Sequence, residues 1–213
     1  MPYQYYTKKR LLVLLLVYNM VKRGKAMINK YTLSRAQNIR YIRDHLDAFI
    51  RNSIALSRYS DEDPLRETAK KNFEEAYEYI MERQDVENDY RCLLTLHETL
   101  MKNLDSGIKS ELTEQQIIEL NEMINQPAKA NTEIAIDVML YILDKRLFSD
   151  GDVRAALMFA NKIMIDSGCG IITVTENNKD VFREKLKEYK NNKDYGIKDW
   201  IYKYCIKGPK LDH

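Results

Sequence analysis

The chain of 213 residues is 45% hydrophobic and contains only seven glycines and four prolines, which predicts one sizeable core and excludes a low-complexity or disordered protein. Its 34 Lys and Arg nearly balance 32 Asp and Glu, so the net charge of +2 gives no global reason to expect nucleic acid. Cys92, Cys169 and Cys205 are widely spaced without a CxxC pair. This spacing argues against a disulfide framework or a structural zinc site and fits a reducing cytoplasm.

An apolar run at residues 11–17 follows the basic residues 8–10 and superficially resembles a secretory signal. Lys22 and Arg23 stand where a signal would need small residues, and the run is far shorter than the roughly 20 residues that span a bilayer. We predict an amphipathic helix at 7–23 that is buried, with a surface-associated helix as the alternative.

Helical periodicity dominates the rest of the chain. Thr113 with Gln116 three residues later is a capping box, and Asp63 followed by Pro64 is a typical helix start. The predicted helices are 34–57, 63–80, 90–104, 113–125, 131–147, 155–165, 178–190 and a last one around Trp200.

Two of these segments are apolar over most of their circumference. We therefore expect the helix at 131–147 to be central and the helix at 155–165 to be its buried partner. Only residues 168–174 resemble a strand. The sequence thus predicts a mainly α, single-domain fold with at most one short hairpin or strand.

Between those two helices lies the sharp turn Arg146-Leu-Phe-Ser-Asp-Gly-Asp-Val-Arg154. A helix that starts at such a turn presents unpaired backbone N–H groups and a positive dipole end, which favour an anion, and Arg154 could add a contact to phosphate. The alternative is an ordinary helix start, with Asp150 or Ser149 as the N-cap and Arg154 at the surface.

The turn resembles the signature of the Fic/Doc (Fido-fold) family, His-x-Phe-x-Asp/Glu-Gly-Asn-Gly/Lys-Arg-x-x-Arg. Phe148, Asp150, Gly151 and Arg154 fall in register with it. Four further segments are similar to the family's elements, in the same order along the chain: 52–57 to its inhibitory helix, 94–101 to its Leu-His-x-x-Leu helix, 131–147 to the helix before the signature, and 155–174 to the helix, glycine turn and extended piece after it. The resemblance covers roughly residues 40 to 205 and implies a Fic-like helical bundle.

Under this resemblance the chain divides into an N-terminal helical extension at 1–35, a Fic-like domain at 36–206 and a tail at 207–213. Active family members transfer AMP or another phosphate-linked group to a protein hydroxyl. Their signature His is the general base, the acidic residue holds Mg²⁺, and the arginines hold the phosphates. The span 104–131 is short and helical where active members usually insert a flap hairpin.

This chain departs from the family at the positions that carry the chemistry. Arg146 stands at the His position and cannot accept a proton at neutral pH. Asp152 replaces the Asn with a negative charge, and Leu157 replaces the second Arg. In the inhibitory motif Ser53 keeps the first position, but Ser57 replaces the Glu that would pair with that second Arg.

The resemblance therefore predicts a Fic-like protein with a degraded adenylyltransferase motif, catalytically inactive, that binds or regulates a protein partner in the cytoplasm. We expect no nucleic acid, no membrane and no cofactor, and leave self-association open. ATP and Mg²⁺ would be used only if activity is retained, with Asp150 as the Mg²⁺ ligand. The vestigial phosphate site consists of Phe148, Ser149, Asp150, Gly151, Asp152 and Arg154.

Two other hypotheses remain open. One is an active transferase of altered mechanism, in which Asp150 holds Mg²⁺, Arg146 and Arg154 hold phosphate, and another residue or the substrate supplies the base. His97 is a candidate for that base, although a histidine between leucines is more often a packing or capping residue, which is the interpretation we favour. The other is an unrelated helical adaptor, which predicts no concave pocket at the Phe148 turn. We also predict that Arg146 and Asp152 pair across the turn.

Overall fold

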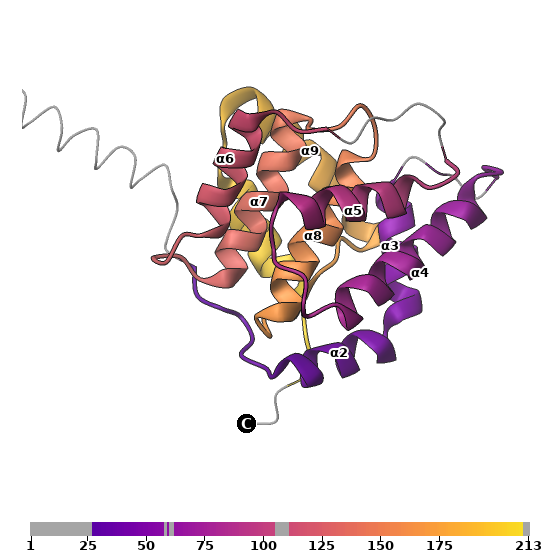
Figure 1. Cartoon of the computed structure of the whole chain (residues 1–213), viewed down its shortest axis with the longest axis horizontal. Coiled ribbons are helices and arrows are strands. Elements are labelled where there is room, and N and C mark those ends of the chain that lie inside the picture. The colour runs from indigo at the N-terminus through magenta and orange to yellow at the C-terminus, as the bar shows by residue number, and fades with distance from the viewer. Residues whose placement is uncertain (1–26, 58, 60–61, 105–110, 211–213) are drawn as a thin grey trace, which may run out of the picture.

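The computed structural model describes residues 27–57, 59, 62–104 and 111–210, and within these ranges the fold is mainly helical (Figure 1). The predicted helix at 7–23 lies outside the described residues. The elements are α2 (Arg35–Asp44), α3 (Leu46–Leu56), α4 (Arg66–Glu82), α5 (Tyr90–Met101), α6 (Glu114–Ile124), α7 (Asn131–Lys145), α8 (Asp152–Asp166), β1 (Ile171–Ile172), a 3-10 turn (Glu176–Asn178), α9 (Lys179–Asn192), α10 (Gly196–Trp200), a π turn (Ile201–Cys205) and β2 (Ile206–Lys207).

The capping chemistry sets several helix starts. The Thr113 side chain accepts the N–H of Gln116, and the Gln116 side chain accepts the N–H of Thr113 in return, so the predicted capping box at α6 is confirmed. Asp63 accepts the N–H of Leu65 just ahead of α4. The Thr113 cap satisfies a backbone donor that the first turn of α6 leaves without an intrahelical acceptor. Helix α4 begins only at Arg66, without a side-chain cap, so its predicted start at Asp63 is three residues too early.

The prediction of one long helix at 34–57 is wrong, because the chain breaks into α2 and α3 at His45. The His45 ring donates from Nδ1 to the carbonyl of Tyr41 at 2.8 Å, and this carbonyl would accept the His45 N–H in a continuous helix. The His45 N–H bonds instead to Ile42, with φ −127° and ψ 13° at the junction. The apolar stripe continues across the break, so periodicity alone could not locate it.

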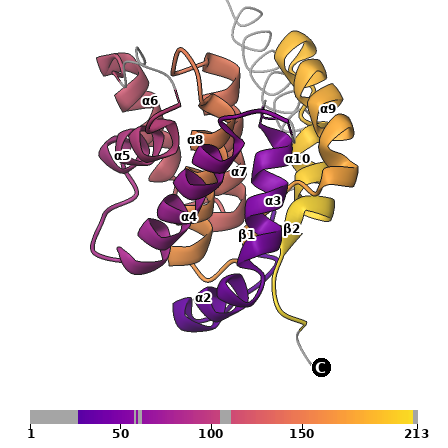
Figure 2. The same cartoon turned by 90° about the vertical axis from the view of Figure 1, so that its right-hand side faces the viewer.

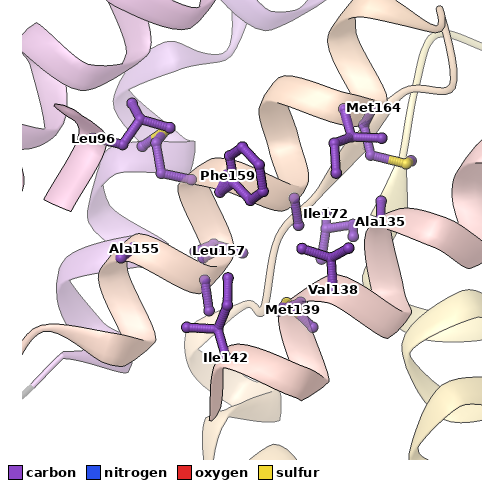
Figure 3. Close-up of a cluster of buried hydrophobic side chains, with 14 of the residues drawn as sticks. Leu96, Ala135, Val138, Met139, Ile142, Ala155, Leu157, Phe159, Met164 and Ile172 are labelled. Atoms are coloured by element: carbon purple, nitrogen blue, oxygen red, sulfur yellow. The ribbon is translucent and has the colours of Figure 1, made fainter. Parts of the chain in front are cut away.

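Helices α7 and α8 form the centre of the fold, as predicted, and they pack on each other more extensively than any other pair of described elements. Every residue of α8 from Arg154 to Ile165 is buried. Figure 3 shows the side chains of the two helices meeting in one apolar cluster, which includes Val138, Ile142, Leu157 and Phe159. Burying such a side chain stabilises the fold by roughly 1.5–3 kcal/mol, so this pair fixes the position of the turn that joins it.

The other helices cover this pair on its two sides. In Figure 2, α5 lies on one side, and α9 and α10 lie on the other. Helix α5 contacts α8, and α9 packs on α10. Residues of α5 and of α9 both lie close to the turn between α7 and α8.

The predicted strand at 168–174 is confirmed in a shorter form. β1 pairs antiparallel with β2, with Ile171 opposite Lys207 and Ile172 opposite Ile206. Asn161 of α8 accepts the N–H of Ile172 and donates to its carbonyl, which ties the strand to the central helix. Lys207, which the sequence assigned to the tail, is thus part of the strand pair.

Residues 27–34, assigned to an N-terminal helical extension, are not helical. The N–H of Leu33 donates to the carbonyl of Gly168 at 2.9 Å, and Asn29 accepts the N–H of Thr132 at the start of α7. This segment packs on the domain. Within the described ranges, none of the helices combines the length and apolarity required to cross a membrane.

Candidate functional site

The turn between α7 and α8 is held in an unusual backbone conformation at both of its ends. Arg146 follows α7 with φ 51°, in the left-handed region, and Gly151 precedes α8 with φ 84°. The first hydrogen bond of α8 joins the N–H of Ala155 to the carbonyl of Gly151. The N–H groups of residues 152–154 therefore have no acceptor within the helix, as the sequence predicted for an anion site.

A cleft of about 430 Å³ opens at this turn. All the turn residues predicted for the phosphate site line it, and so does Arg146. The cleft is also lined by Ser57, at the end of α3, and by Arg183 and Lys190 of α9. The adaptor hypothesis expected no concave pocket here, so the cleft counts against that hypothesis.

Arg154 lines the cleft and is only 4% exposed. Its guanidinium lies 3.7 Å from a carboxylate oxygen of Asp150, contacts the sulfur of Met101 through Nη2 and stands 5.1 Å from the ring centre of Tyr59. Its Nη1 is buried without a hydrogen-bond partner. A buried charged donor in this state favours an anion as its acceptor.

Asp150, the predicted Mg²⁺ ligand, lines the cleft and accepts the N–H of Gly151 at 2.7 Å. Asp144, which precedes the turn, does not line the cleft beside Asp150. Its carboxylate instead accepts hydrogen bonds from Nζ of Lys193 at 2.7 Å. Over the part of the chain that the structure describes, no group of three or more His, Cys, Asp or Glu side chains could hold a metal. Mg²⁺ in proteins is often coordinated by one or two carboxylates together with water and the phosphate oxygens of a substrate. The single carboxylate of Asp150 is therefore compatible with a Mg²⁺ ion whose other ligands would be water and a bound phosphate.

His97 of α5 lies directly behind the turn, although no histidine is near it in sequence. Its ring stacks on Phe148 with centres 3.7 Å apart, and its Nε2–H donates to the backbone carbonyl of Asp150 at 2.8 Å. The ring is fully buried, and burial, with the charge of Arg154 as a further cause, lowers the pKa of His97. The interpretation of His97 as a packing residue therefore fits better than that of a displaced base.

Asp152 does not pair with Arg146, which corrects our prediction. Its Oδ1 accepts the N–H of Phe148 at 3.1 Å, and no ion pair joins it to Arg146 among the described side chains. Burial raises the pKa of Asp152 to about 6, against the opposing effects of the Phe148 and Leu147 N–H groups, Lys190 and Arg146. Asp152 is four residues after Phe148, so its carboxylate can accept this backbone N–H across the turn. This hydrogen bond positions the carboxylate without an ion pair to Arg146.

The raised pKa of Asp152 predicts a pH-dependent stability. The folded pKa lies above the unfolded value of about 3.9, so the stabilising contribution of the protonated form is complete below about pH 4 and is lost as the pH rises through 6. Asp152→Asn keeps an acceptor for the Phe148 N–H and removes the charge. We expect this variant to be more stable than the wild type at pH 7 by about 1–2 kcal/mol, a value reduced because the side chain is partly exposed.

Urea unfolding at pH 4, 5, 6 and 7 measures this effect. The difference between Asp152→Asn and the wild type should be small at pH 4 and grow up to pH 7. Asp144→Asn is the control, because Asp144 lies outside the cleft and its carboxylate is salt-bridged to Lys193. A difference for Asp152→Asn that does not change with pH would contradict the expectation.

The three remaining motif positions lie in different places. Ser53 is buried, its hydroxyl donates to the carbonyl of Phe49 at 2.8 Å, and it does not line the cleft. Ser57 does line the cleft, and its hydroxyl donates to the carbonyl of Ser53. Leu157 is 3% exposed and lies in the core between α7 and α8 (Figure 3). The position of the family's second Arg is therefore closed off from the cleft.

The sequence interpretation missed the contribution of α9. The cleft is lined by Arg183, Leu186 and Lys190, although the sequence predicted only a helix at 178–190. Their spacing of three and four residues places them on one helical face, and this was the signal available in the sequence. No sequence pattern indicated that this face would meet the turn.

Comparison of the chain with protein-family models and with curated proteins gives no match.

Proposed function

We propose that this protein is a Fic-like protein that binds a nucleotide phosphate in the cleft at the Phe148 turn and does not transfer the adenylyl group. One observation carries the proposal. The family resemblance selected Ser57 and the turn at 146–154, about ninety residues further along the chain. Ser57, Arg146 and residues 148–154 line the same cleft, and the buried Nη1 of Arg154 has no hydrogen-bond partner.

The surroundings of the turn argue against adenylyl transfer. The side chain at the position of the family's base is Arg146, which cannot take a proton from a target hydroxyl. His97 is close but fully buried, and it donates its Nε2 proton to the Asp150 carbonyl. Neither side chain can act as a general base on a substrate that enters the cleft.

A protein that keeps a ligand site without its chemistry can still serve as a binding or regulatory module. We propose that nucleotide binding stabilises the turn and the end of α3, and that a protein partner recognises this state. The described cysteines Cys92, Cys169 and Cys205 are all buried and unpaired, which fits the proposed cytoplasmic location.

Calorimetric titration of ATP with Mg²⁺ tests the proposal. We expect a dissociation constant in the micromolar range for the wild type, and a value at least about tenfold weaker for Arg154→Met, because a charge-assisted bond to phosphate is lost while the aliphatic packing is kept. Arg83→Met is the control, since Arg83 is exposed, pairs with Asp85 and lies outside the cleft. Thermal melting of each variant checks that it remains folded.

Two outcomes would contradict the proposal. The absence of binding heat in the wild type would leave a scaffold without a nucleotide site. Transfer of label from ATP labelled at the α-phosphate to any protein in an extract would instead favour the transferase of altered mechanism, with Asp150 and Mg²⁺ at the phosphates.

A further inference from the structure

The charge of the chain is distributed unevenly along the sequence. Residues 1–26, which lie outside the described residues, contain six Lys and Arg and no Asp or Glu, whereas the remainder contains 28 Lys and Arg against 32 Asp and Glu. The first 26 residues therefore carry a formal charge of +6, and the rest of the chain carries −4. Such an asymmetry is typical of a segment that contacts an anionic surface.

The same residues contain the apolar run 11–17, with basic residues at 8–10 before it and at 22, 23 and 25 after it. The run is too short to cross a bilayer, which takes roughly 20 residues. A short apolar stretch between cations suits the headgroup region of a membrane, because the apolar side chains can enter the acyl boundary while the cations stay with the lipid phosphates. Nucleic acid would instead require aromatic rings on which bases stack, and leucine and valine have none.

The described chain begins at a face that also carries cations. Ile28 is 71% exposed, and Nζ of Lys30 donates to the carbonyls of Tyr202, Lys203 and Ile206 at 3.2–3.3 Å. These hydrogen bonds fix this part of the chain beside the π turn and the start of β2. The segment that precedes residue 27 is therefore connected to the domain at this face.

We call the side chains of Ile28, Lys30, Lys203, Tyr204 and Lys207 the basic aromatic face. Nζ of Lys203 stands 5.1 Å from the ring centre of Tyr204, which is 43% exposed. Burial, and next the charge of Lys207, lower the pKa of Lys30, so these two ammonium groups repel each other. Among the described side chains, no carboxylate lies at ion-pair distance from any of the three lysines.

Two carboxylates beside the start of the described chain are already paired. Glu133 accepts the N–H of Met27 at 3.3 Å, and its other oxygen lies 3.2 Å from Nζ of Lys198. Asp137 lies 2.7 Å from the same ammonium group and 2.5 Å from that of Lys129. These acidic groups are therefore engaged elsewhere, and the lysines of the basic aromatic face keep their charge.

The single tryptophan of the chain borders the same face. The ring of Trp200 is half-buried, and its centre lies 5.9 Å from that of Tyr204. Tryptophan and tyrosine are enriched where a protein meets the boundary between lipid and water, because each combines an apolar ring with a polar group. The face thus offers the residue types that suit a lipid headgroup layer.

We propose that residues 1–26 and the basic aromatic face together bind the surface of a membrane that contains anionic lipids. The proposal favours the surface-associated helix at 7–23 over the buried one. Two signals are needed because one short apolar segment or a few cations alone give weak and reversible attachment. The attachment uses neither the cleft nor a nucleotide, so it is independent of the proposed function.

Flotation of the full chain with lipid vesicles tests the proposal. We expect vesicles of phosphatidylcholine with about 30% phosphatidylserine to bind at least about tenfold more tightly than phosphatidylcholine alone, and added salt to weaken this binding. Replacing Leu12 and Leu15 together with glutamate should abolish it, because charged side chains are costly among acyl chains.

A second variant tests the described face. Lys203→Gln with Lys207→Gln should weaken binding to phosphatidylserine vesicles about threefold to tenfold, because two contacts to anionic lipid are lost. Lys70→Gln with Lys71→Gln is the matched control, since both lysines are exposed on α4, which lies on a different side of the domain from β2 in Figure 2. Thermal melting checks that both double variants remain folded.

Trp200 provides a readout specific to this face. Because the chain has a single tryptophan, its emission reports on the surroundings of Trp200 alone. We expect phosphatidylserine vesicles to shift this emission to shorter wavelength and to reduce its quenching by acrylamide. The variant with glutamate at positions 12 and 15 should show neither change.

Four outcomes would overturn the proposal. The first is the absence of flotation with either kind of vesicle. The second is equal binding to both compositions, which would contradict the electrostatic contribution. The third is binding that leaves the Trp200 emission unchanged and does not depend on Lys203 and Lys207. The fourth is binding to a single-stranded oligonucleotide without binding to vesicles, which would assign the basic residues to nucleic acid.

Discussion

Replacing Gly151 with alanine is expected to lower the free energy of unfolding by about 3 kcal/mol, the sum of a left-handed backbone penalty and overpacking. Gly151 has φ 84°, and a Cβ there would stand 2.6 Å from the Met101 sulfur and 3.0 Å from Nε2 of His97. The His97 ring is fixed by its stack on Phe148, so it cannot withdraw without breaking that contact. Backbone strain and the clash therefore act together.

Urea unfolding followed by circular dichroism measures this change. The control is Gly196→Ala, because Gly196 has an ordinary φ and its Cβ would meet only the flexible side chain of Asp194, at 3.2 Å. We expect the control to change stability by less than about 1 kcal/mol. If both substitutions changed the free energy of unfolding equally, the close contact between Gly151 and α5 would be contradicted.

The same substitution should also weaken the binding of ATP. The carbonyl of Asp150 accepts the hydrogen bond from His97, so a shift of the ring moves the turn that carries Asp150 and Arg154. Gly151 thus links the packing of the core to the geometry of the cleft. Calorimetry on Gly151→Ala, at a temperature where it is still folded, should show weaker binding than in the Gly196→Ala control.

Replacing Asp166 with alanine is expected to lower the free energy of unfolding by about 3–5 kcal/mol, the usual cost of leaving a buried charge unpaired. Asp166, at the end of α8, accepts hydrogen bonds from Lys162, Arg35 and Asn88. Lys162 is fully buried, and among the described residues its other hydrogen bond runs to the carbonyl of Val86. Without Asp166, the ammonium group of Lys162 has no counter-ion in the core.

Two comparison variants make this expectation specific. Asp85→Ala removes one partner of the exposed pair with Arg83 and should cost less than about 1 kcal/mol, because surface ion pairs contribute little. Lys162→Met combined with Asp166→Ala removes the buried charge along with its partner and should recover most of the stability that Asp166→Ala loses. A double variant as unstable as Asp166→Ala would show that the loss comes from Arg35 or Asn88 instead.

The sequence predicted the helices well where their signals are local. The capping box at Thr113 and the apolar helices on either side of the turn depend on residues within a few positions of each other, and periodicity reports such contacts directly. The break at His45 was missed because it depends on a side-chain bond to Tyr41, which leaves the apolar stripe unchanged.

The residues of the candidate site also fall into those that the sequence could indicate and those that only the structure could. The turn residues from Phe148 to Arg154 could be named from the sequence because they are contiguous and carry a recognisable order. The place of His97 could not be derived, since its contact with Asp150 joins positions 53 residues apart. The hydrogen-bond partner of Asp152 could not be derived either, because an ion pair with Arg146 and a hydrogen bond from the Phe148 N–H are equally compatible with the sequence.

The sequence by itself determined that this protein is mainly helical, which segments are most apolar, and which turn carries the charged residues of interest. Only the tertiary structure decided that α9 and the end of α3 meet that turn, that Arg154 is buried with an unbonded nitrogen, and that Arg183 and Lys190 line the same cleft. The physical reason is that helix formation follows from nearby residues along the chain. A cleft arises from the packing of faces that are far apart along the chain, such as His97 and Asp150, which are 53 residues apart, and no local pattern encodes which faces will meet.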